Sequence, residues 1–322
     1  MSVDPAPADV VCIASWNADL VSRVARPMAR GETLLATAFS ISPGGKGSNA
    51  AVAAARQGAR VALVARIGDD DFGRMGLDLW QTEGIATEYV ERANGERSGV
   101  AQILVYDDGD NSIAVHPGAG SGLNAQHVLA ARRLIEACKV VMASCEVPLE
   151  ATLKAFQIAR EAGVKTILNP APARRLPEGL LGLVDILTPN ESELYQLAGE
   201  GHADNLHSAA NHLLAQGAGS VLVTLGSEGC ALYQIGCEPI TLPGRHMPVA
   251  DTIGAGDTFT GSLAASLARG VPLASAMQWA NAAAALSVTR HGAVAGIPLL
   301  AEVAALLPQA DRQISRPECQ TA

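Results

Sequence analysis

The sequence predicts an α/β protein in which a mostly parallel central sheet is accompanied by a smaller β-sheet. Short apolar runs alternate with helical stretches, two segments interrupt that alternation, and no linker, repeat or low-complexity tract divides the 322 residues. Strands that alternate with helices are typical of βαβ units and of parallel sheets. The expected strands are residues 10–15, 60–66, 140–143, 164–168, 186–188 and 220–224, and the expected helices are residues 49–57, 124–137, 149–162, 192–197 and 206–216.

The smaller sheet is expected from residues 20–42 and 96–116, which have little helical periodicity. The second segment alternates like a pair of antiparallel strands around a turn with the sequence DDGDN. We therefore expect a single domain over residues 1–322, with the added sheet formed by approximately residues 17–43 and 96–117. The polar residues at 312–322 are expected to fray.

The C-terminal third is expected to be helical. Phe259, Leu263 and Leu267 recur at a spacing of four residues, which places them on one face of a helix. Gly270 ends that helix, and the small residues at 254–257 lie at its N-terminus.

Composition and charge exclude several classes of function. The formal net charge is −9 and no basic stripe is present, so nucleic-acid partners are not expected. No uninterrupted apolar stretch of about 18 residues occurs, so no membrane span is expected. The first ten residues contain Asp4 and Asp9 and lack the positive charge of a secretory signal. Six cysteines without a CxxC pair favour free thiols in a cytoplasmic protein.

The strongest chemical motif is residues 251–258 (DTIGAGDT), at the start of the C-terminal helix. Its small residues let successive backbone N–H groups face one concavity where the helix dipole is positive. Such a pocket suits an anion, above all a phosphoryl group during transfer. Asp257 is unexpected there, because a carboxylate repels a resting phosphate, but it is suited to accept a proton from an attacking hydroxyl group. Taken alone, Asp257 or Thr258 could equally serve as a helix cap.

A second glycine cluster spans residues 43–49 (PGGKGSN), just before the helix expected at 49–57. It is not a P-loop, because Gly47 follows Lys46 where Ser or Thr is required, and position 40 is Ser40 instead of glycine. It also lacks the third glycine of a dinucleotide-binding fingerprint. Glycines admit a ligand close to the backbone, and the lysine and Asn49 offer hydrogen bonds to hydroxyl groups. A glycine-rich helix start with a solvated lysine is the plainer interpretation.

Smaller motifs lie near the ends of the expected strands. Asn17 and Asp19 follow the first strand, where ligand sites form in α/β proteins, although Asx turns use the same residues. Asn190 and Glu193 are three residues apart and could face a hydrated Mg²⁺, but a helix capping box has the same spacing. Residues 224–229 predict a strand end, a glycine turn and a returning strand.

Together these residues resemble the ribokinase-like, or PfkB-type, carbohydrate kinases over about residues 10–298. The two signature segments are residues 44–58 (GGKGSNAAVAAARQG) and 251–261 (DTIGAGDTFTG), and their order and spacing carry the resemblance. Shorter matching phrases are residues 17–19 (NAD), 67–70 (IGDD), 168–173 (LNPAPA), 188–191 (TPNE) and 223–227 (VTLGS). The resemblance implies a ribokinase-like three-layer sandwich in which the small β-sheet is a lid over the sugar.

The resemblance also implies the chemistry, which is MgATP-dependent phosphorylation of a sugar hydroxyl. In the most similar members this is the 5-hydroxyl of D-ribose, giving ribose 5-phosphate and ADP. Asp257 would be the general base, and the backbone of Gly254, Ala255 and Gly256 would be the anion hole. The positions that match sugar contacts are Asn17, Asp19, Gly45, Lys46, Asn49, Glu146 and Asp257. Those that match ATP contacts are Asn190, Thr224, Gly226, Ser227, Gly229, Gly256 and Asn281. Those that match metal sites are Asn190 and Glu193 for Mg²⁺ through water, and Asp251, Ile253, Ser287, Arg290, Gly292 and Gly296 for K⁺.

The sequence departs from the family pattern at a few positions. Trp16 stands where a smaller aliphatic residue is expected, and Ser48 and Ala51 stand where Ala and Gln are commoner. Asn281 occupies a position that is His in some relatives. Because Trp16 and the lid affect which sugar fits, kinases of the same family that act on 2-deoxyribose, fructose, ketodeoxygluconate or a nucleoside are alternatives.

Two alternatives come from other functional classes. A catalytically silent sugar-sensing protein on the same scaffold is one, because a fold does not determine a function. A nicotinamide-dependent oxidoreductase also fits the α/β pattern, but the sequence has no GxGxxG after the first strand. We also expect a homodimer formed through the lid, because an exposed sheet can pair with a second copy.

Overall fold

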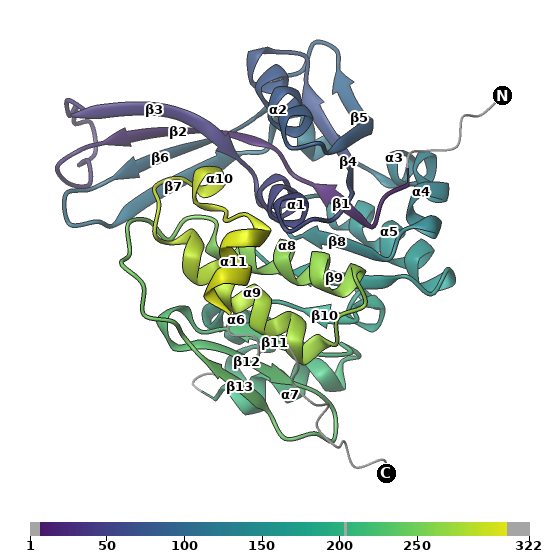
Figure 1. Cartoon of the computed structure of the whole chain (residues 1–322). Helices are drawn as coiled ribbons and strands as arrows, with labels where there is room; N and C mark the ends of the chain where they lie inside the picture. Colours follow the sequence, from purple (N-terminus) through teal and green to yellow (C-terminus); the bar gives the residue numbers. More distant parts are fainter. Residues whose placement is uncertain (1–6, 203–204, 308–322) are drawn as a thin grey trace.

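The computed structural model describes residues 7–202 and 205–307 and confirms the expected α/β fold (Figure 1). The strands of the main sheet are β1 (Val10–Ala14), β4 (Val61–Gly68), β5 (Ala86–Ala93), β8 (Val140–Ser144), β9 (Lys165–Asn169), β10 (Ile186–Leu187), β11 (Val221–Thr224), β12 (Gly229–Tyr233) and β13 (Ile240–Pro243). Their order is β13-β12-β11-β10-β9-β8-β1-β4-β5. The strands from β11 to β5 pair in parallel, and β12 and β13 are added as antiparallel neighbours.

Helices cover both faces of this sheet and bury a separate core on each. Successive side chains of a strand point to opposite faces, so Val11 and Ile13 enter one core while Val10, Cys12 and Ala14 enter the other. The first core is covered by α3 (Ala125–Ala130), α4 (Arg132–Ala137), α5 (Leu149–Glu161), α6 (Glu191–Ala198) and α7 (Leu206–Ala215). The second is covered by α1 (Lys46–Arg56), α2 (Asp71–Thr82), α8 (Ala255–Ala268) and α9 (Leu273–Ser287).

Shorter elements complete the body. The helices α10 (Ala293–Gly296) and α11 (Leu300–Leu306) follow α9, and 3₁₀ turns occupy Gly118–Gly122, Leu181–Leu183, Glu200–His202 and Gly226–Glu228. Within the described ranges, no helix has the length and apolar character needed to cross a membrane.

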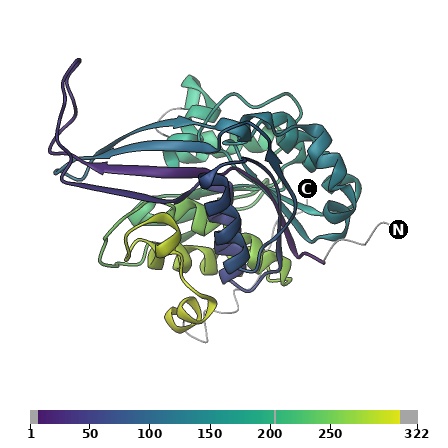
Figure 2. The same ribbon diagram turned by 90° about the horizontal axis from the view of Figure 1, so that it is seen from above.

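The second sheet has four strands and extends to one side of the body (Figure 2). They are β2 (Asn17–Arg23), β3 (Ala38–Gly44), β6 (Gly99–Val105) and β7 (Asn111–His116), in the order β3-β2-β6-β7. We call this sheet the lid. The expected hairpin of β6 and β7 is antiparallel, as is the pair of β2 and β3. The two central strands, β2 and β6, are parallel, which the sequence did not indicate.

The structure adds elements that were not expected and corrects two that were. Helix α2 and strand β5 were not expected, because Gly73 and Gly76 weaken the helical pattern and β5 is a partly exposed strand at the sheet edge. The expected helix at 124–137 is two helices, separated at Ala131, whose N–H donates to the Val128 carbonyl in a tight i−3 turn. Helix α1 begins at Lys46 and not at residue 49, so the glycine cluster is itself the helix start.

The expectation of free thiols is confirmed for the buried Cys12, Cys138, Cys145 and Cys230. It is wrong for Cys237, which is disulfide-bonded in the structure. This cysteine lies in the connection between β12 and β13, where its partly exposed sulfur is accessible for pairing. The expected fraying of residues 312–322 lies outside the described residues.

Helices α1 and α8 pack against each other at Gly261. A Cβ atom at this glycine would lie 2.1 Å from the carbonyl oxygen of Ala50 and 2.7 Å from the Cβ of Ala53. The backbones therefore approach as closely as the absence of a side chain allows. This contact fixes the relative position of the glycine cluster at the start of α1 and the GAGD sequence at the start of α8.

We predict that Gly261→Ala lowers the free energy of unfolding by about 2 kcal/mol or more, because the added methyl group forces two packed backbones apart. Gly256→Ala in the same helix is the matched control, because nothing lies within 4 Å of the added Cβ. Alanine is the better helix former by about 1 kcal/mol, so the control keeps or gains stability. Urea unfolding followed by circular dichroism measures both changes, and equal losses in the two variants would contradict the prediction.

Candidate active site

The predicted site residues gather at the carboxyl ends of the parallel strands, where open α/β sheets bind ligands. Strand β1 ends at Ala14 and leads directly into Asn17 and Asp19 of the lid. Strands β8 and β10 end shortly before Glu146 and Asn190. The glycine cluster and helix α8 face the same edge, because Asn49 of α1 contacts Asp257 of α8.

Glu146 is held by hydrogen bonds from two other segments. The Ser15 hydroxyl donates to Glu146 Oε2 at 2.5 Å, and the Lys46 backbone N–H donates to the same oxygen at 2.8 Å. The Ser15 Oγ also accepts from the Gly47 N–H at 3.0 Å. Ser15 therefore links the end of β1, the glycine cluster and Glu146. The sequence reasoning missed this residue, and its position at the end of the first strand was the one signal available.

Asp257 and Asn49 form a buried pair. Asn49 Nδ2 donates to Asp257 Oδ2 at 2.9 Å, and the two residues are 5% and 4% exposed. Burial raises the pKa of Asp257, while the positive charge of Lys46 and the hydrogen bond from Asn49 oppose that rise. The other polar atom of the amide, Asn49 Oδ1, is buried and accepts no hydrogen bond from the residues that the structure describes. A buried acceptor without a donor is costly, which favours a ligand hydroxyl group at this position.

Several carboxylates and one lysine influence one another's charge at the base of the lid. Burial, and then the negative charges of Glu146 and Asp257, raise the pKa of Asp19 to about 7, while Lys46 opposes the rise. The charge of Asp257, more than that of any other neighbour, raises the pKa of Lys46. A Cβ at Gly44 would lie 2.1 Å from Asp19 Oδ1, so a side chain there would displace this carboxylate. The site therefore combines a permanent cation with hydrogen-bond acceptors for hydroxyl groups.

The start of helix α8 leaves an open space suited to an anion. Gly254 adopts the left-handed conformation with φ 78°, which a residue with a side chain rarely adopts. The first N–H groups of a helix have no partners within it, and they carry the positive end of its dipole. A Cβ at Gly256 would meet no described atom within 4 Å outside its own helix turn, and Gly256 lines an open cavity.

All seven residues predicted to contact ATP line one cavity of about 620 Å³, which is within the usual range for ligand sites. The cavity also reaches Ala255, at the start of α8. Asn281 is held in its wall by the hydrogen bond that its Nδ2 donates to the Pro243 carbonyl at 3.0 Å. The segment 244–247 also lines the cavity and was missed, because it carries no motif.

A second cavity of about 550 Å³ lies between the lid and the segments 249–253 and 291–293. Asp19, Ser40 and Ser42 line it from the lid. Asp251 lines it from the body, so the lid and the start of the α8 motif face each other across this space.

The residues predicted to bind Mg²⁺ and those predicted to bind K⁺ make different hydrogen bonds in the structure. Asn190 Oδ1 accepts from the Glu193 N–H, and Glu193 Oε2 accepts from the Asn190 N–H, which is a helix capping box. No cluster of three or more His, Cys, Asp or Glu suited to a metal ion occurs in residues 7–202 and 205–307. Asp251 accepts hydrogen bonds from the N–H groups of Ile253 and Gly292, at 3.0 and 2.9 Å.

The remaining K⁺ candidates surround Gly296. A Cβ there would lie 2.5 Å from the Ser287 carbonyl oxygen and 3.6 Å from that of Arg290, so the glycine lets these carbonyls come close together. The guanidinium group of Arg290 is paired with Glu302, which leaves its carbonyl as the group available to a cation.

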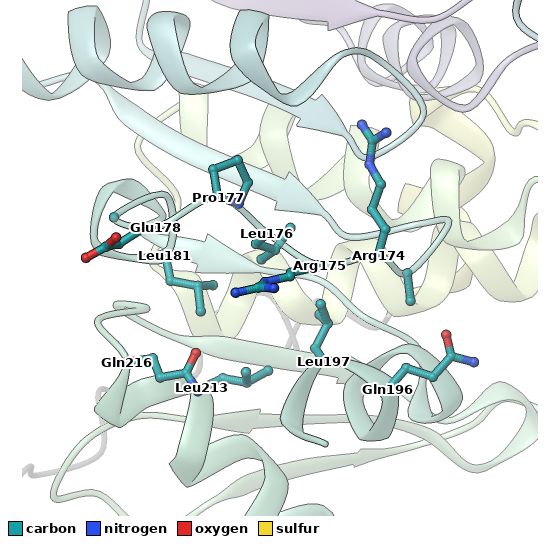
Figure 3. Close-up of a pocket in the computed structure, with 12 residues that line it drawn as sticks. Arg174, Arg175, Leu176, Pro177, Glu178, Leu181, Gln196, Leu197, Leu213 and Gln216 are labelled. Carbon is teal, nitrogen blue, oxygen red and sulfur yellow. The ribbon is translucent and has the colours of Figure 1, made fainter. Parts of the chain in front are cut away.

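A separate cavity of about 580 Å³ lies between the segment after β9 and helices α6 and α7 (Figure 3). Arg175 extends across it, whereas Arg174 points away from it. Arg174 donates to the carbonyl of Val147, the residue after Glu146. Within the described part of the chain, the lining of this cavity includes none of the residues predicted for sugar, nucleotide or metal.

A model of the pfkB family carbohydrate kinases matches residues 7–300. The chain belongs to this family. The expected class of enzyme, a phosphotransferase, is confirmed with it. Among curated relatives of this pfkB-family kinase, a ribokinase of Haemophilus influenzae is 38% identical over 300 residues, which cover 92% of the chain and 98% of that protein. A deoxyribokinase of Salmonella typhi is 34% identical over 293 residues, which cover 90% of the chain and 95% of that protein.

Solved structures also resemble the pfkB-family chain. A ribokinase of Arabidopsis thaliana, solved with ribose and ATP, has a TM-score of 0.85 and 30% sequence identity to it. The match covers 94% of this chain and 99% of that protein. The large, mostly parallel sheet with a smaller second sheet is therefore a shared architecture.

The raised pKa of Asp19 predicts a specific dependence of stability on pH. Between the ordinary value of 3.8 and the folded value of about 7, the folded protein binds a proton that the unfolded chain releases. The contribution of Asp19 therefore lowers the free energy of unfolding as the pH rises through this window, and it is constant above it. In the ligand-free Asp19→Asn variant this contribution is absent, so the variant gains stability relative to the wild type between about pH 5 and about pH 8.

Urea unfolding at these two pH values measures the difference. Asp78→Asn, on the exposed face of α2, is the control with the same change of charge. A difference between wild type and Asp19→Asn that is the same at both pH values would overturn the assignment.

Proposed function

We propose that the chain is an ATP-dependent kinase that phosphorylates the 5-hydroxyl of D-ribose, giving ribose 5-phosphate and ADP. The observation that carries this proposal is the position of the Asn49–Asp257 pair. It lies in one charge cluster with Asp19, Lys46 and Glu146, and Asp257 is in the first turn of α8. The cavity lined by the ATP-matching residues begins at that same helix start. The ribokinase relatives and the Arabidopsis complex with ribose and ATP support the choice of substrates.

In the proposed reaction, Asp257 accepts the proton of the 5-hydroxyl group as its oxygen attacks the γ-phosphorus. A bond forms between this oxygen and phosphorus, and the bond from phosphorus to the β,γ-bridging oxygen breaks, which releases ADP. The backbone N–H groups of Gly254, Ala255 and Gly256 hold the charge that develops on the transferring group. Burial keeps the pKa of Asp257 raised, which makes it a stronger base than an exposed aspartate.

The hydroxyl groups of the sugar would be held by the residues around Asp257. Asn17, Asp19 and Glu146 supply acceptors, Gly45 admits the sugar close to the backbone, and the free Oδ1 of Asn49 accepts from a sugar hydroxyl. Lys46 is the cation among these carboxylates. The lid covers this space and excludes water, which would otherwise accept the phosphoryl group.

Mg²⁺ would arrive with the nucleotide and neutralise the charge of its phosphates. Asn190 and Glu193 would hold this ion through water, and the charge of Glu193 acts on the pKa values of Lys46 and Asp257, so it is near the proposed reacting groups. The capping box uses one Glu193 oxygen and leaves the other for a water ligand of the ion. Asn190, Thr224, Gly226, Ser227, Gly229, Gly256 and Asn281 would hold ATP.

We also propose K⁺ at the carbonyl groups around Gly296, with Asp251, Ile253, Ser287, Arg290 and Gly292. Asp251 supports this site by joining the 251–253 turn to Gly292, so a cation there would stabilise the start of α8. Turnover is expected to fall when tetramethylammonium replaces K⁺, and unchanged turnover would remove this ion from the proposal.

The cytoplasmic location expected from the sequence stays a prediction.

We predict that Asp257→Asn reduces turnover by about 10²-fold or more, the usual cost of losing a general base, while the protein remains folded.

A coupled assay of ADP formation would compare D-ribose, 2-deoxyribose, fructose, ketodeoxygluconate and nucleosides, because a deoxyribokinase is among the relatives. The highest kcat/KM is expected for D-ribose. Near-normal turnover of Asp257→Asn would contradict the mechanism, and a higher value for another sugar would contradict the substrate. Calorimetric ribose binding without any ADP formation would favour the sugar sensor.

A homodimer through the lid is proposed from its exposed apolar side chains. Ile113 and Val115 are 54% and 49% exposed. Their register places Ile113 opposite Ile103 and Val115 opposite Ala101, which itself lies opposite Asp19. Residues directly opposite share a face of a sheet, so these side chains lie on the sugar-facing side. A second lid packed there would bury them and help to close the site.

We predict that Ile113→Arg converts the dimer to a monomer and raises the KM for D-ribose, because a buried unpaired charge destabilises the interface. Ile41→Arg is the matched control, because Ile41 is 48% exposed but pairs with Leu20 on the opposite face. Sedimentation velocity measures the state of each variant. A monomeric wild type, or equal effects of the two substitutions, would exclude this interface.

A further inference from the structure

Two tryptophans pack together at the base of the lid, and neither is among the residues proposed to bind or react. Trp16 and Trp80 are 2% and 0% exposed. Their ring centroids are 5.4 Å apart with an interplanar angle of 73°, an edge-to-face arrangement that is favourable for aromatic pairs. Trp16 is the residue before Asn17, and Trp80 belongs to α2. The pair therefore connects the base of the lid to a helix that the sequence did not predict.

Each indole makes one hydrogen bond, and each bond reaches a different part of the molecule. Trp16 Nε1–H donates to the Phe72 carbonyl at 3.1 Å, near the start of α2. Trp80 Nε1–H donates to Ser48 Oγ at 2.9 Å, within the glycine cluster and next to Asn49. Trp16 and Ser48, which both depart from the family pattern, are thus joined through Trp80.

The fit between Trp16 and α2 depends on a glycine. A Cβ at Gly76 would lie 2.9 Å from the Trp16 ring, so any side chain at this position would displace the indole. The backbone of Trp16 is equally confined, because a Cβ at Gly45 would lie 2.9 Å from its Cα, and one at Gly99 would lie 2.6 Å from its carbonyl oxygen. The residue is enclosed by the glycine cluster, by α2 and by the first residue of β6.

Helix α2 also holds the second central strand of the lid. The carboxylate of Asp70, which caps α2, accepts from the Ser98 N–H at 2.9 Å and from the Ser98 hydroxyl at 2.7 Å. Ser98 immediately precedes β6, and Gly99 of β6 pairs with Asn17 of β2. One helix therefore contacts the bases of both central lid strands and, through Ser48, the start of α1.

We propose that Trp16 and Ser48 are positioning residues that hold the base of the lid against the glycine cluster, so that the lid and body contacts reach the sugar together. This inference rests on the proposed sugar kinase function. Neither side chain is given a role in phosphoryl transfer or nucleotide binding. Weakening the connection therefore lowers the affinity for the sugar and leaves the chemical step and the affinity for ATP unchanged.

The first test is Trp16→Phe, which keeps an aromatic ring and removes the N–H donor. The loss of one hydrogen bond of about 1 kcal/mol corresponds to a change of about fivefold. We expect the KM for D-ribose to rise by about this factor, with the kcat and the KM for ATP changed by less than about twofold. Ser48→Ala removes the acceptor of the Trp80 N–H without changing an aromatic ring. We again expect a higher KM for D-ribose with kcat and the KM for ATP nearly unchanged. Trp279→Phe, in α9, is the control and should change none of the three values.

A second test uses the close contact at Gly76. Gly76→Ala is expected to raise the KM for D-ribose, although alanine is the better helix former. Combined with Trp16→Phe, which removes part of the indole, Gly76→Ala should add little, because the two changes act on one contact. Independent, additive effects of the two substitutions would argue against the positioning role.

Tryptophan fluorescence gives a readout that a purely structural role would not change. In Trp279→Phe the remaining tryptophans are Trp16 and Trp80, since the chain has three. We expect saturating D-ribose to shift their emission in this variant. A missing shift, or a parallel rise in the KM values for ribose and ATP in both Trp16→Phe and Ser48→Ala, overturns the inference. If the wild type turns over another sugar but not ribose, the proposed substrate is wrong. The KM for that sugar, the kcat and the KM for ATP are then compared in the same variants.

Discussion

The hydrogen bond from Asn49 to Asp257 joins the two helices whose N-terminal ends form the site. Burial raises the pKa of Asp257, and the charge of Lys46 and the bond from Asn49 oppose that rise, so the aspartate is buried but not isolated. The bond requires α1 and α8 to pack backbone to backbone, which the absence of a side chain at Gly261 permits. A displacement of either helix would separate the glycine cluster from the start of α8, and the parts of the site proposed to bind sugar and nucleotide would no longer meet.

The packing of α1 against α8 brings several carboxylates close to a single lysine. Asp19, Glu146, Glu193 and Asp257 all act on the charge of Lys46, in a chain whose formal net charge is −9. Such a surrounding does not attract an anionic nucleotide by its overall charge. In the proposed mechanism, backbone N–H groups at the start of α8 act instead at short range, because their partial charges are fixed in direction. Hydroxyl groups, by contrast, suit a cluster rich in acceptors, so the two halves of the site differ in the chemistry that they admit.

Local sequence was enough to predict the glycine cluster, the GAGD helix start and the alternation of strands and helices, because each depends on neighbouring residues. The parts that were missed depend on contacts between distant segments. Ser15 becomes important only because Glu146 and Gly47, far along the chain, converge on it. The parallel pairing of β2 and β6 also depends on contacts between distant segments, and so does the position of residues 244–247 in the cavity wall. Helix α2 was hidden by its glycines, and Gly76 is there because the Trp16 ring occupies the space of a side chain.

The parallel pair at the centre of the lid has a mechanical consequence. Strands β2 and β6 leave the body side by side at Asn17 and Gly99 and run outward together for seven residues each, a length of roughly 23 Å at about 3.3 Å per residue. The lid would therefore move like a lever that turns about its base, where the proposed sugar contacts lie. A rotation of about 10° at the base would move the far end by roughly 4 Å while Asn17 hardly moves. Such a rotation would change access to the site while the groups proposed to bind the sugar at the base of the lid move little.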